Sequence, residues 1–315
     1  MNIFVSCDWG TSNLRLRLVD KDSKKVLKEV ETNEGIATIY KSWKREAPDT
    51  DRFSYYLSIV KMHIDKWRKE NIPLMENIPV LVSGMASSTI GIAELAYAPM
   101  PMRADGSGLL VKKFDSSTAF PFPLFIISGA STSGDAMRGE ETLLAGCDTQ
   151  RGKTELFIFP GTHSKHVRVT DGVADNLASY MTGELFSLLS RQSVLSASVQ
   201  EPENDMAVGF FEKGISEGSH MNLLNRIFQV RINHLFKKAT AAENFDYLSG
   251  LLIGAELSSL KGKNFDLVTV VSGERLMNKY LSGLRLLDTG KKIDQLDAGS
   301  ALVNGHCKII SRFKK

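Results

Sequence analysis

The sequence predicts an α/β protein built from two domains of similar size. Its 315 residues exceed the length of one ordinary domain. Short apolar runs and the period-two alternation typical of strands are interspersed with segments of helical periodicity. A strand, a polar turn and a second strand open the first half, and the same order returns after the polar stretch 149–154. We therefore place the domain boundary in that stretch, with domains at 1–150 and 151–315.

Periodicity in the first half predicts strands joined by tight turns, followed by helices. Apolar runs or alternation of apolar and polar residues predict strands at 3–7, 14–20, 26–32, 79–84 and 124–128. One apolar stripe, recurring every three to four residues, predicts a helix from Arg52 to Glu70. A second helix is expected from Ala136 to Leu144, after a loop rich in glycine and serine.

The second half is mostly helical between strands at its beginning and near its end. Strands are expected at 156–159, 165–169 and 266–271. Helices are expected at 177–191, 205–217, 221–235, 242–260, 274–286 and 300–310. Gly250 and Gly254 lie four residues apart in an apolar helix, which indicates close packing of that helix against another.

Composition and charge argue against several classes of function. The net charge of +3 is too small to indicate a nucleic-acid partner. Cys7, Cys147 and Cys307 are widely spaced and odd in number, so neither a disulfide framework nor a C-x-x-C motif is expected. No apolar run is long enough to span a bilayer, and the N-terminus lacks the pattern of a signal peptide. We expect a cytoplasmic protein without a membrane partner.

A polar turn joins the first two predicted strands and carries the first candidate site. Residues 8–15 read Asp-Trp-Gly-Thr-Ser-Asn-Leu-Arg. A turn with glycine and small hydroxyl residues can aim N–H groups and side-chain donors at phosphate oxygens. Asp8 ends a strand and can hold Mg²⁺, usually through water. The alternative is an ordinary hairpin stabilised by an Asx turn.

A second turn has the same layout in the second half. Residues 159–165 read Phe-Pro-Gly-Thr-His-Ser-Lys. Two such turns, facing each other across a cleft, would hold a triphosphate from both sides. Neither a G-x-x-x-x-G-K-[ST] loop nor a G-x-G-x-x-G fingerprint is present. The prediction of nucleotide binding therefore rests on the pair of hairpins.

A third group of polar residues lies between the two hairpins, in Gly134-Asp135-Ala136-Met137-Arg138-Gly139-Glu140-Glu141-Thr142. Asp135 sits where a helix N-cap belongs. Arg138 has the planar guanidinium that binds a carboxylate in bidentate fashion. Its alternative is a structural ion pair with Glu141 or Glu184. On a helix beginning at Asp135, that residue and Arg138 would project on the same side.

Five blocks of the chain, in order and spread over its length, resemble the 2-dehydro-3-deoxygalactonokinase family. These blocks are 83–88, 137–141, 160–165, 181–186 and 248–256. The resemblance implies two actin/hexokinase-like, or ribonuclease H-like, domains flanking an ATP cleft. It implies transfer of the γ-phosphate of ATP, with Mg²⁺, to the 6-hydroxyl of 2-dehydro-3-deoxy-D-galactonate in galactonate catabolism.

The resemblance also implies roles for individual residues. The residues expected at the nucleotide are Asp8, Gly10, Thr11, Ser12, Asn13, Gly161, Thr162, His163 and Gly273. The residues expected near the sugar acid are Arg15, Gly84, Met85, Ser87, Lys165 and Glu184. Asp135 would orient the attacking hydroxyl as a base, with Glu140 as the alternative. Gly273 would let adenosine approach the backbone, although a plain strand-to-helix turn also explains it.

Two other functions remain open at this point. One is a kinase for another sugar or sugar acid on the same fold. The other is an actin-like switch protein, in which ATP drives closure or assembly without phosphorylating a small molecule. The group from Asp135 to Glu141, with Arg138 beside possible bases, favours a small anionic substrate. A fold does not fix a function, so this choice leans on the resemblance.

Overall fold

The computed structural model describes residues 2–70, 77–203, 206–287 and 290–313. Its contacts divide the chain into two compact units. The first unit consists of Met1–Thr149, Gly172–Asn176 and Gly299–Lys315. The second consists of Gln150–Asp171 and Leu177–Ala298. No helix among the described residues is both long and apolar enough to cross a membrane.

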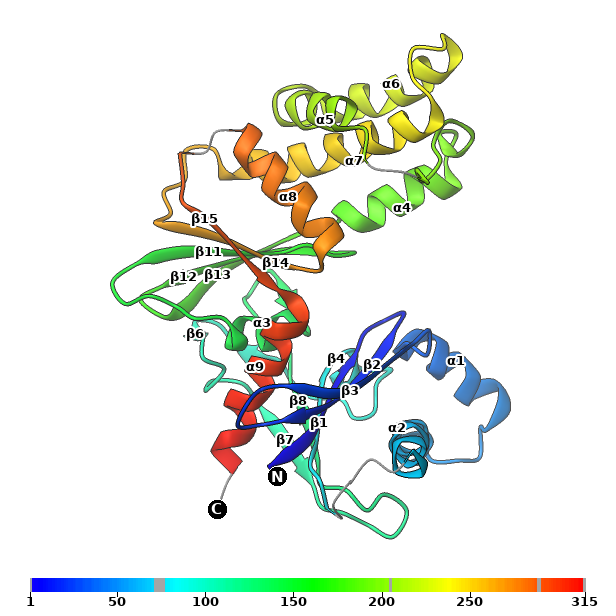
Figure 1. The fold of residues 1–315 in the computed structure, drawn as a ribbon, viewed down its shortest axis with the longest axis vertical. Coiled ribbons are helices and arrows are strands. Elements are labelled where there is room, and N and C mark those ends of the chain that lie inside the picture. Colours follow the sequence, from blue (N-terminus) through cyan, green and yellow to red (C-terminus); the bar gives the residue numbers. More distant parts are fainter. Residues whose placement is uncertain (1, 71–76, 204–205, 288–289, 314–315) are drawn as a thin grey trace. The chain divides into compact units, whose positions relative to one another are not determined.

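The first unit is built on a mixed sheet in the order β3-β2-β1-β4-β8-β7 (Figure 1). Its strands are β1 Ile3–Trp9, β2 Leu14–Asp20, β3 Val26–Thr32, β4 Val80–Gly84, β7 Val111–Phe114 and β8 Leu124–Ile127. β1 pairs antiparallel with β2 and parallel with β4, and β4 pairs parallel with β8. The helices of this unit are α1 Ile36–Glu46, α2 Arg52–Lys69, α3 Glu140–Gly146 and α9 Ala298–Ile310.

Shorter elements complete the first unit. The turn of 3₁₀ helix η1, Met85–Ser87, follows β4 directly. A small sheet of three strands has the order β10-β9-β5, with bounds β5 Ala98–Pro99, β9 Ala130–Ser131 and β10 Ala136–Met137. β6, Met102–Arg103, pairs antiparallel with Val173 and Ala174.

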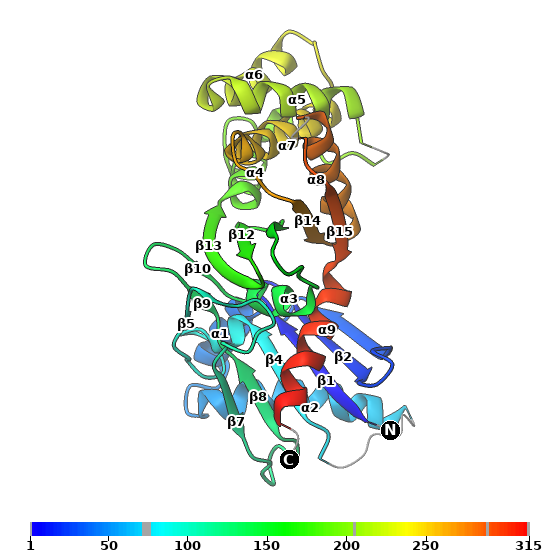
Figure 2. The same ribbon diagram turned by 90° about the vertical axis from the view of Figure 1, so that its left-hand side faces the viewer.

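The two faces of the first sheet differ in polarity because side chains alternate along each strand. Val5, Cys7 and Trp9 are buried in an apolar core shared with α1 and α2. Cys7 is thus a buried free thiol. The opposite face carries Ser6, whose Oγ forms a 2.8 Å hydrogen bond with Nδ1 of the buried His306 on α9. Figure 2 shows α9 lying along the strands of this sheet.

The second unit repeats the strand order of the first. Its strands are β11 Thr154–Phe159, β12 Ser164–Thr170, β13 Val173–Tyr180, β14 Leu267–Ser272 and β15 Ile293–Asp297, and they lie in the order β15-β14-β11-β12-β13. β11 pairs antiparallel with β12 and parallel with β14, which pairs parallel with β15. In both units the first strand thus lies between the second and the fourth. This repeat confirms the predicted fold class, two ribonuclease H-like domains of the actin/hexokinase type.

The helices of the second unit gather on one side of its sheet (Figure 1). They are α4 Thr182–Gln192, α5 Val208–His220, α6 Leu223–Leu235, α7 Ala241–Leu257 and α8 Glu274–Leu286. α5 and α7 pack closely through glycines: a Cβ on Gly250 would lie 2.2 Å from the Phe211 carbonyl oxygen, and one on Gly254 would lie 2.3 Å from that of Ile215. The prediction of close packing at these glycines is confirmed.

Two predicted helices begin later than expected. The prediction of a helix from Ala136 is wrong, because Ala136 and Met137 pair with β9 as β10 and α3 starts only at Glu140. The helix predicted from Leu177 begins at Thr182, because β13 extends to Tyr180. In both places a strand precedes the helix. β10 has only two residues, too few to show an alternation, and the last residues of the eight-residue β13 merge with the helical stripe that follows.

Candidate functional site

The first hairpin, between β1 and β2, is built against the start of α1. The N–H of Gly10 donates to the Asn13 carbonyl at 2.9 Å and closes the turn. The carbonyls of Gly10, Thr11 and Ser12 accept N–H groups from Gly35 and the first two residues of α1. The hairpin and the residue before α1 are in close contact, since a Cβ on Gly35 would lie 2.2 Å from the Ser12 carbonyl carbon. The side chains of Thr11 and Ser12 remain exposed, as a phosphate-binding turn requires.

Asp8, Arg15 and Glu31 form a row across three strands on the polar face of the first sheet. Arg15 Nη2 lies 2.7 Å from Glu31 Oε1, and Arg15 Nη1 lies 3.8 Å from Asp8 Oδ2. Desolvation raises the pKa of Asp8, whereas the positive charge of Arg15 opposes that shift. The Asp8 side chain is still 36% exposed. Arg15 is therefore held by carboxylates, while Asp8 offers a carboxylate that solvent can reach.

Glycines let three segments of the first unit meet beside Asp8. Gly84 ends β4 with φ of 82°, and a Cβ there would lie 2.8 Å from the Trp9 carbonyl oxygen and 3.5 Å from Asp8 Oδ1. Gly139 precedes α3 with φ of 113°, and its Cβ would lie 3.5 Å from the Cα of Gly84. Other residues rarely adopt these φ values. The ends of β1 and β4 and the start of α3 are therefore brought together, with Arg138 next in sequence to Gly139.

Arg138 is fixed on the loop that follows β4. Its Nη1 donates to the Ser87 carbonyl oxygen at 2.6 Å and to Ser87 Oγ at 2.5 Å. Its guanidinium carbon lies 4.2 Å from the centre of the Tyr97 ring. Both Ser87 and Met85 belong to η1, so the predicted residues of this loop and Arg138 come together. The expectation of an Arg138 ion pair with Glu141 is not met, since Glu141 accepts the N–H of Gly139 instead.

Asp135 does not cap a helix, which corrects the sequence prediction. It lies in a tight turn where its N–H donates to Thr132 Oγ1 at 3.0 Å and its carbonyl accepts the Thr132 N–H at 2.8 Å. Its Oδ1 accepts the N–H of Ala136 at 2.7 Å. The residue that precedes α3 is Gly139, which has no side chain to cap it. Asp135 and Arg138 therefore do not share a helix face, since a short strand separates them.

Two glutamates begin α3 and differ sharply in environment. Glu140 Oε2 accepts the N–H of Arg138 at 3.0 Å and so holds the backbone beside the guanidinium. Glu141 is fully buried and accepts the N–H of Gly139 at 2.7 Å. Desolvation and the neighbouring charge of Glu140 raise the pKa of Glu141 to about 8. Glu141 is therefore a neutral acid at pH 7, a feature that no sequence pattern indicated.

The second hairpin joins β11 to β12 and packs against the start of α4. Thr162 accepts the N–H of Glu184 at 2.9 Å through its carbonyl oxygen. A Cβ on Gly183 would lie 2.4 Å from the Gly161 carbonyl oxygen, so only glycine allows this approach. His163 Nε2 lies 2.6 Å from Glu184 Oε2. Predicted residues Gly161, Thr162, His163 and Glu184 thus form one cluster.

Lys165 lies apart from that cluster. Its side chain is buried and its Nζ donates to Ser179 Oγ on β13 at 2.6 Å. Nothing in this arrangement supports the predicted contact of Lys165 with the sugar acid.

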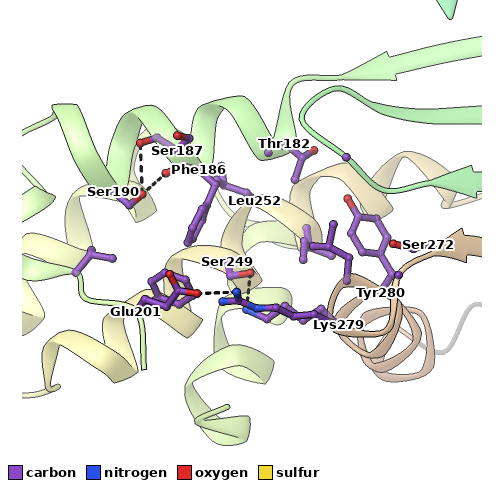
Figure 3. Close-up of a pocket in the computed structure, with 18 of the residues that line it drawn as sticks. Thr182, Phe186, Ser187, Ser190, Glu201, Ser249, Leu252, Ser272, Lys279 and Tyr280 are labelled. Atoms are coloured by element: carbon purple, nitrogen blue, oxygen red, sulfur yellow. Dashed lines mark hydrogen bonds and ion pairs between the residues drawn. The ribbon is translucent and has the colours of Figure 1, made fainter. Parts of the chain in front are cut away.

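A pocket of about 650 Å³ opens beside the second hairpin, within the second unit (Figure 3). Its apolar walls come from three helices and from the strand-to-helix turn after β14. Phe186 and Phe245 meet edge to face with ring centres 4.9 Å apart, and Leu252 and Ile253 of α7 extend the same surface. The volume is that of a typical small-molecule site, about 300 to 1,000 Å³.

Two predicted glycines, Gly161 and Gly273, line this pocket. Gly273 has φ of −73°, a value open to any residue. A Cβ added at either position would meet no described atom within 4 Å. Neither backbone strain nor packing therefore demands glycine there. The absent side chains leave open space in the pocket, as expected if a ligand occupies it.

Charged groups line one wall of the pocket. Lys279 Nζ lies 3.2 Å from Asp246 Oδ1 and 3.2 Å from Ser249 Oγ. Desolvation lowers the pKa of Lys279, although Asp246 opposes the shift. Glu201 and Arg275 form an exposed ion pair of 2.6 Å. Figure 3 shows Glu201, Ser249 and Lys279 along the same wall. No sequence motif marks these residues, because they come from α7, α8 and the loop at Glu201, which are separated along the chain.

Comparison with known proteins places this geometry in a family. The family profile described as 2-keto-3-deoxy-galactonokinase matches residues 8–309. A protein of Rhizobium meliloti (strain 1021), named as a probable 2-dehydro-3-deoxygalactonokinase, is 30% identical, over 96% of this chain and 94% of its own. The 2-dehydro-3-deoxygalactonokinase of Escherichia coli (strain K12) is 28% identical, over 88% of this chain and 87% of its own.

A crystal structure agrees with these matches. It is that of a Sinorhizobium meliloti protein provisionally named as a 2-dehydro-3-deoxygalactonokinase, and it superposes with a TM-score of 0.80 at 28% identity, covering 98% of this chain and 96% of that one. Both the sequence matches and the superposition extend over nearly the whole chain. The protein therefore belongs to the 2-keto-3-deoxy-galactonokinase family.

Proposed function

We propose that this protein transfers the γ-phosphate of ATP to the 6-hydroxyl of 2-dehydro-3-deoxy-D-galactonate, in the cytoplasm and as a step of galactonate catabolism. Membership of the family and the names of its relatives support this reaction. The observation that carries it is the pocket beside the second hairpin, in which Gly161 and Gly273 leave space that packing does not require.

The nucleotide would bind in the second unit. The adenine ring has apolar surface to stack on at Phe186 and Leu252, and the open space at Gly273 lets it approach the backbone. The hairpin at Gly161, Thr162 and His163 offers N–H groups for phosphate oxygens. Hairpin residues Gly10, Thr11, Ser12 and Asn13 would do the same from the first unit.

The sugar acid would bind through Arg138. Its described hydrogen bonds to Ser87 use Nη1, and Tyr97 supports the guanidinium plane. The Nε and Nη2 groups lie on one edge of that plane and match the two oxygens of a carboxylate. A guanidinium held in place before the substrate arrives loses little conformational entropy on binding. Gly84 and Met85, which precede Ser87, would line the same site.

Asp135 would act as the base that orients the attacking hydroxyl. The N–H of Ala136 donates to Oδ1 at 2.7 Å and holds the carboxylate in one orientation, as a positioned base requires. Glu140 is the alternative, although its carboxylate already accepts the N–H of Arg138. Glu141 is a poor base at neutral pH, because burial keeps it protonated.

Asp8 would hold Mg²⁺. Among the described residues no group of three histidine, cysteine or acidic side chains could hold a metal. Mg²⁺ does not need such a group, because it keeps several waters and binds through one or two carboxylates and the phosphates of its substrate. A carboxylate that is 36% exposed fits that role. When bound, the ion would neutralise charge on the phosphates.

A coupled assay of ADP release tests the proposal against its two rivals. Purified protein is given Mg²⁺ and ATP with each of several 2-keto-3-deoxy acids, with neutral sugars, or with no acceptor. We expect release of ADP that depends on 2-dehydro-3-deoxy-D-galactonate. Turnover of a different acceptor alone would indicate another sugar kinase. Binding or hydrolysis of ATP that no acceptor stimulates would indicate a switch protein.

A further inference from the structure

Glu256, near the end of α7, is the centre of a buried hydrogen-bond network. Its side chain is only 1% exposed. Oε1 accepts from Ser164 Oγ at 2.7 Å and from His166 Nε2 at 2.9 Å. Oε2 accepts from Tyr280 Oη at 2.7 Å and from Thr182 Oγ1. One carboxylate thus joins β12, α4 and α8 to α7.

The network fixes Glu256 in its ionised form. Burial acts to raise the pKa of Glu256, but hydrogen bonds from His166, Thr182 and Ser164 and the attraction of His166 outweigh it, so that the pKa lies below its ordinary value. An ionised carboxylate only accepts hydrogen bonds. Each partner must therefore turn a hydrogen toward Glu256, and charge-assisted bonds of this kind are the strong ones.

The partners of Glu256 surround the candidate nucleotide site on two sides. Ser164 directly follows the second hairpin, and Thr182 is the first residue of α4, whose start packs on that hairpin. Thr182 and Tyr280 both line the pocket, and Figure 3 shows their side chains at the same end of it. Because their hydroxyl hydrogens point to Glu256, these two residues present oxygen lone pairs to a ligand, which suits a hydroxyl or a water.

We propose that Glu256 is a positioning residue for nucleotide binding: it holds the phosphate-binding hairpin, the start of α4 and the Tyr280 wall in the arrangement that the nucleotide fits. This inference rests on the proposed function. The position of Glu256 is itself fixed, because Gly250 and Gly254 on the same helix lie against the backbone of α5. Glu256 acts through its partners and does not line the pocket.

The substitution Glu256→Gln tests this role because it keeps shape and volume. A glutamine has one acceptor oxygen and a donor amide, so it cannot satisfy four donors. A matched control is Glu155→Gln. Glu155 is also a buried glutamate of the second unit, on β11, where it accepts the N–H of Gln150 at 2.8 Å, and it does not line the pocket.

The measurement is the Kd of a fluorescent ADP analogue for wild type, E256Q and E155Q, each shown to be folded by its thermal transition. Leaving buried donors unsatisfied costs about 1–3 kcal/mol, so we expect E256Q to bind the nucleotide about ten- to a hundredfold more weakly. The KM for the sugar acid should stay near the wild-type value. E155Q should bind the nucleotide as wild type does.

A second variant separates positioning from stability. Tyr280→Phe removes one donor to Glu256 and should weaken nucleotide binding in the wild-type background. In the E256Q background the same change should have less effect, because the acceptor has already been lost. Folded E256Q with wild-type nucleotide affinity, or fully additive effects of the two changes, would overturn the role of Glu256. Absence of saturable nucleotide binding in wild type would instead overturn the proposed function.

Discussion

The guanidinium of Arg138 lies 4.2 Å from the centre of the Tyr97 ring, and its Nη1 donates to Ser87. This arrangement fixes the plane of the guanidinium and the direction of its remaining edge. A lysine at this position would keep the charge but would lose both the planar edge and the stacking on the ring. Arg138 is thereby set up to receive a planar anion.

We predict that Arg138→Lys raises the KM for the keto-acid by about ten- to a hundredfold, the effect of losing a charged bidentate contact. The KM for ATP should change little. Steady-state kinetics with each substrate varied in turn measures both. The control is Tyr97→Phe, which keeps the ring and should behave nearly as wild type. A rise in the KM for ATP alone would assign Arg138 to the phosphates.

Changes at Asp8 should affect the use of Mg²⁺ and leave the fold intact. Asp8→Asn removes the charge from a carboxylate that is 36% exposed. We expect turnover to fall by about a hundredfold or more, as on loss of a group that stabilises transferring charge, and the Mg²⁺ concentration for half-maximal rate to rise. A Mg²⁺ titration of the rate measures both. A folded variant with the turnover and Mg²⁺ dependence of wild type would exclude Asp8 as the metal ligand.

The base can be identified by comparing two carboxylates of the first unit. We predict that Asp135→Asn lowers kcat by a factor of about 10² to 10⁴, the usual effect of losing a positioned base. Its thermal stability should change little, because Asp135 does not cap a helix and an amide oxygen can still accept the Ala136 N–H. Glu140→Gln provides the comparison. If kcat falls with E140Q and not with D135N, the roles of the two residues are reversed.

Glu141 makes stability depend on pH with a definite sign. Its pKa is about 8 in the folded protein and near 4.5 as its ordinary value. Between these values the folded state holds a proton that the unfolded state has lost, so the free energy of unfolding falls as pH rises. Below about pH 4.5 Glu141 does not lower the free energy of unfolding, because it is protonated in both states. Above about pH 8 it is ionised in both states, and the loss of free energy of unfolding is complete.

Glu141→Gln should remove this contribution, because an amide stays neutral. We predict that the difference in free energy of unfolding between wild type and E141Q changes in favour of E141Q as pH rises from 5 to 8, by a few kcal/mol in all, at about 1.4 kcal/mol per pKa unit. Urea unfolding at four pH values measures the difference. A difference that does not vary with pH would show that Glu141 is not buried as a neutral acid.

The open space at Gly273 gives a prediction for the pocket. Since φ is −73° and an added Cβ would meet no described atom within 4 Å, Gly273→Val should leave thermal stability nearly unchanged. Its methyl groups would occupy space meant for the ligand, so the Kd for ATP should rise about tenfold, the effect of mild overpacking. The control is Gly209→Val, because a Cβ at Gly209 would also meet no described atom within 4 Å and Gly209 does not line the pocket. Equal ATP affinity for G273V and wild type would place the nucleotide elsewhere.

Local patterns predicted part of this molecule and missed what depends on distant contacts. Short strand–turn–strand patterns predict the hairpins at Gly10 and Gly161. The four-residue spacing of Gly250 and Gly254 in an apolar helix predicts the close packing of that helix. Asp135 was expected to cap a helix because a helical stripe follows it, but Gly139, with φ of 113°, delays the helix. A positive φ at one glycine leaves no periodic signal.

The pocket could not be predicted as a whole. Phe186, Phe245 and Lys279 lie on α4, α7 and α8, which are separated by long stretches of sequence. The core of the second unit sets their approach, and no motif marks them. Glu256 is the last residue of the block 248–256 that resembles the family. Its role as acceptor of four hydrogen bonds depends on donors far away in the sequence, between Ser164 on β12 and Tyr280 on α8.

The position of the transferred phosphate tests the proposed reaction most directly. Protein, Mg²⁺, ATP and 2-dehydro-3-deoxy-D-galactonate are incubated together, and the product is examined by ³¹P and ¹H NMR. We predict one new phosphomonoester signal, coupled to the two hydrogens on C6, that grows in step with ADP. Inorganic phosphate as the only product, or a phosphate attached at another carbon, would contradict the proposed function.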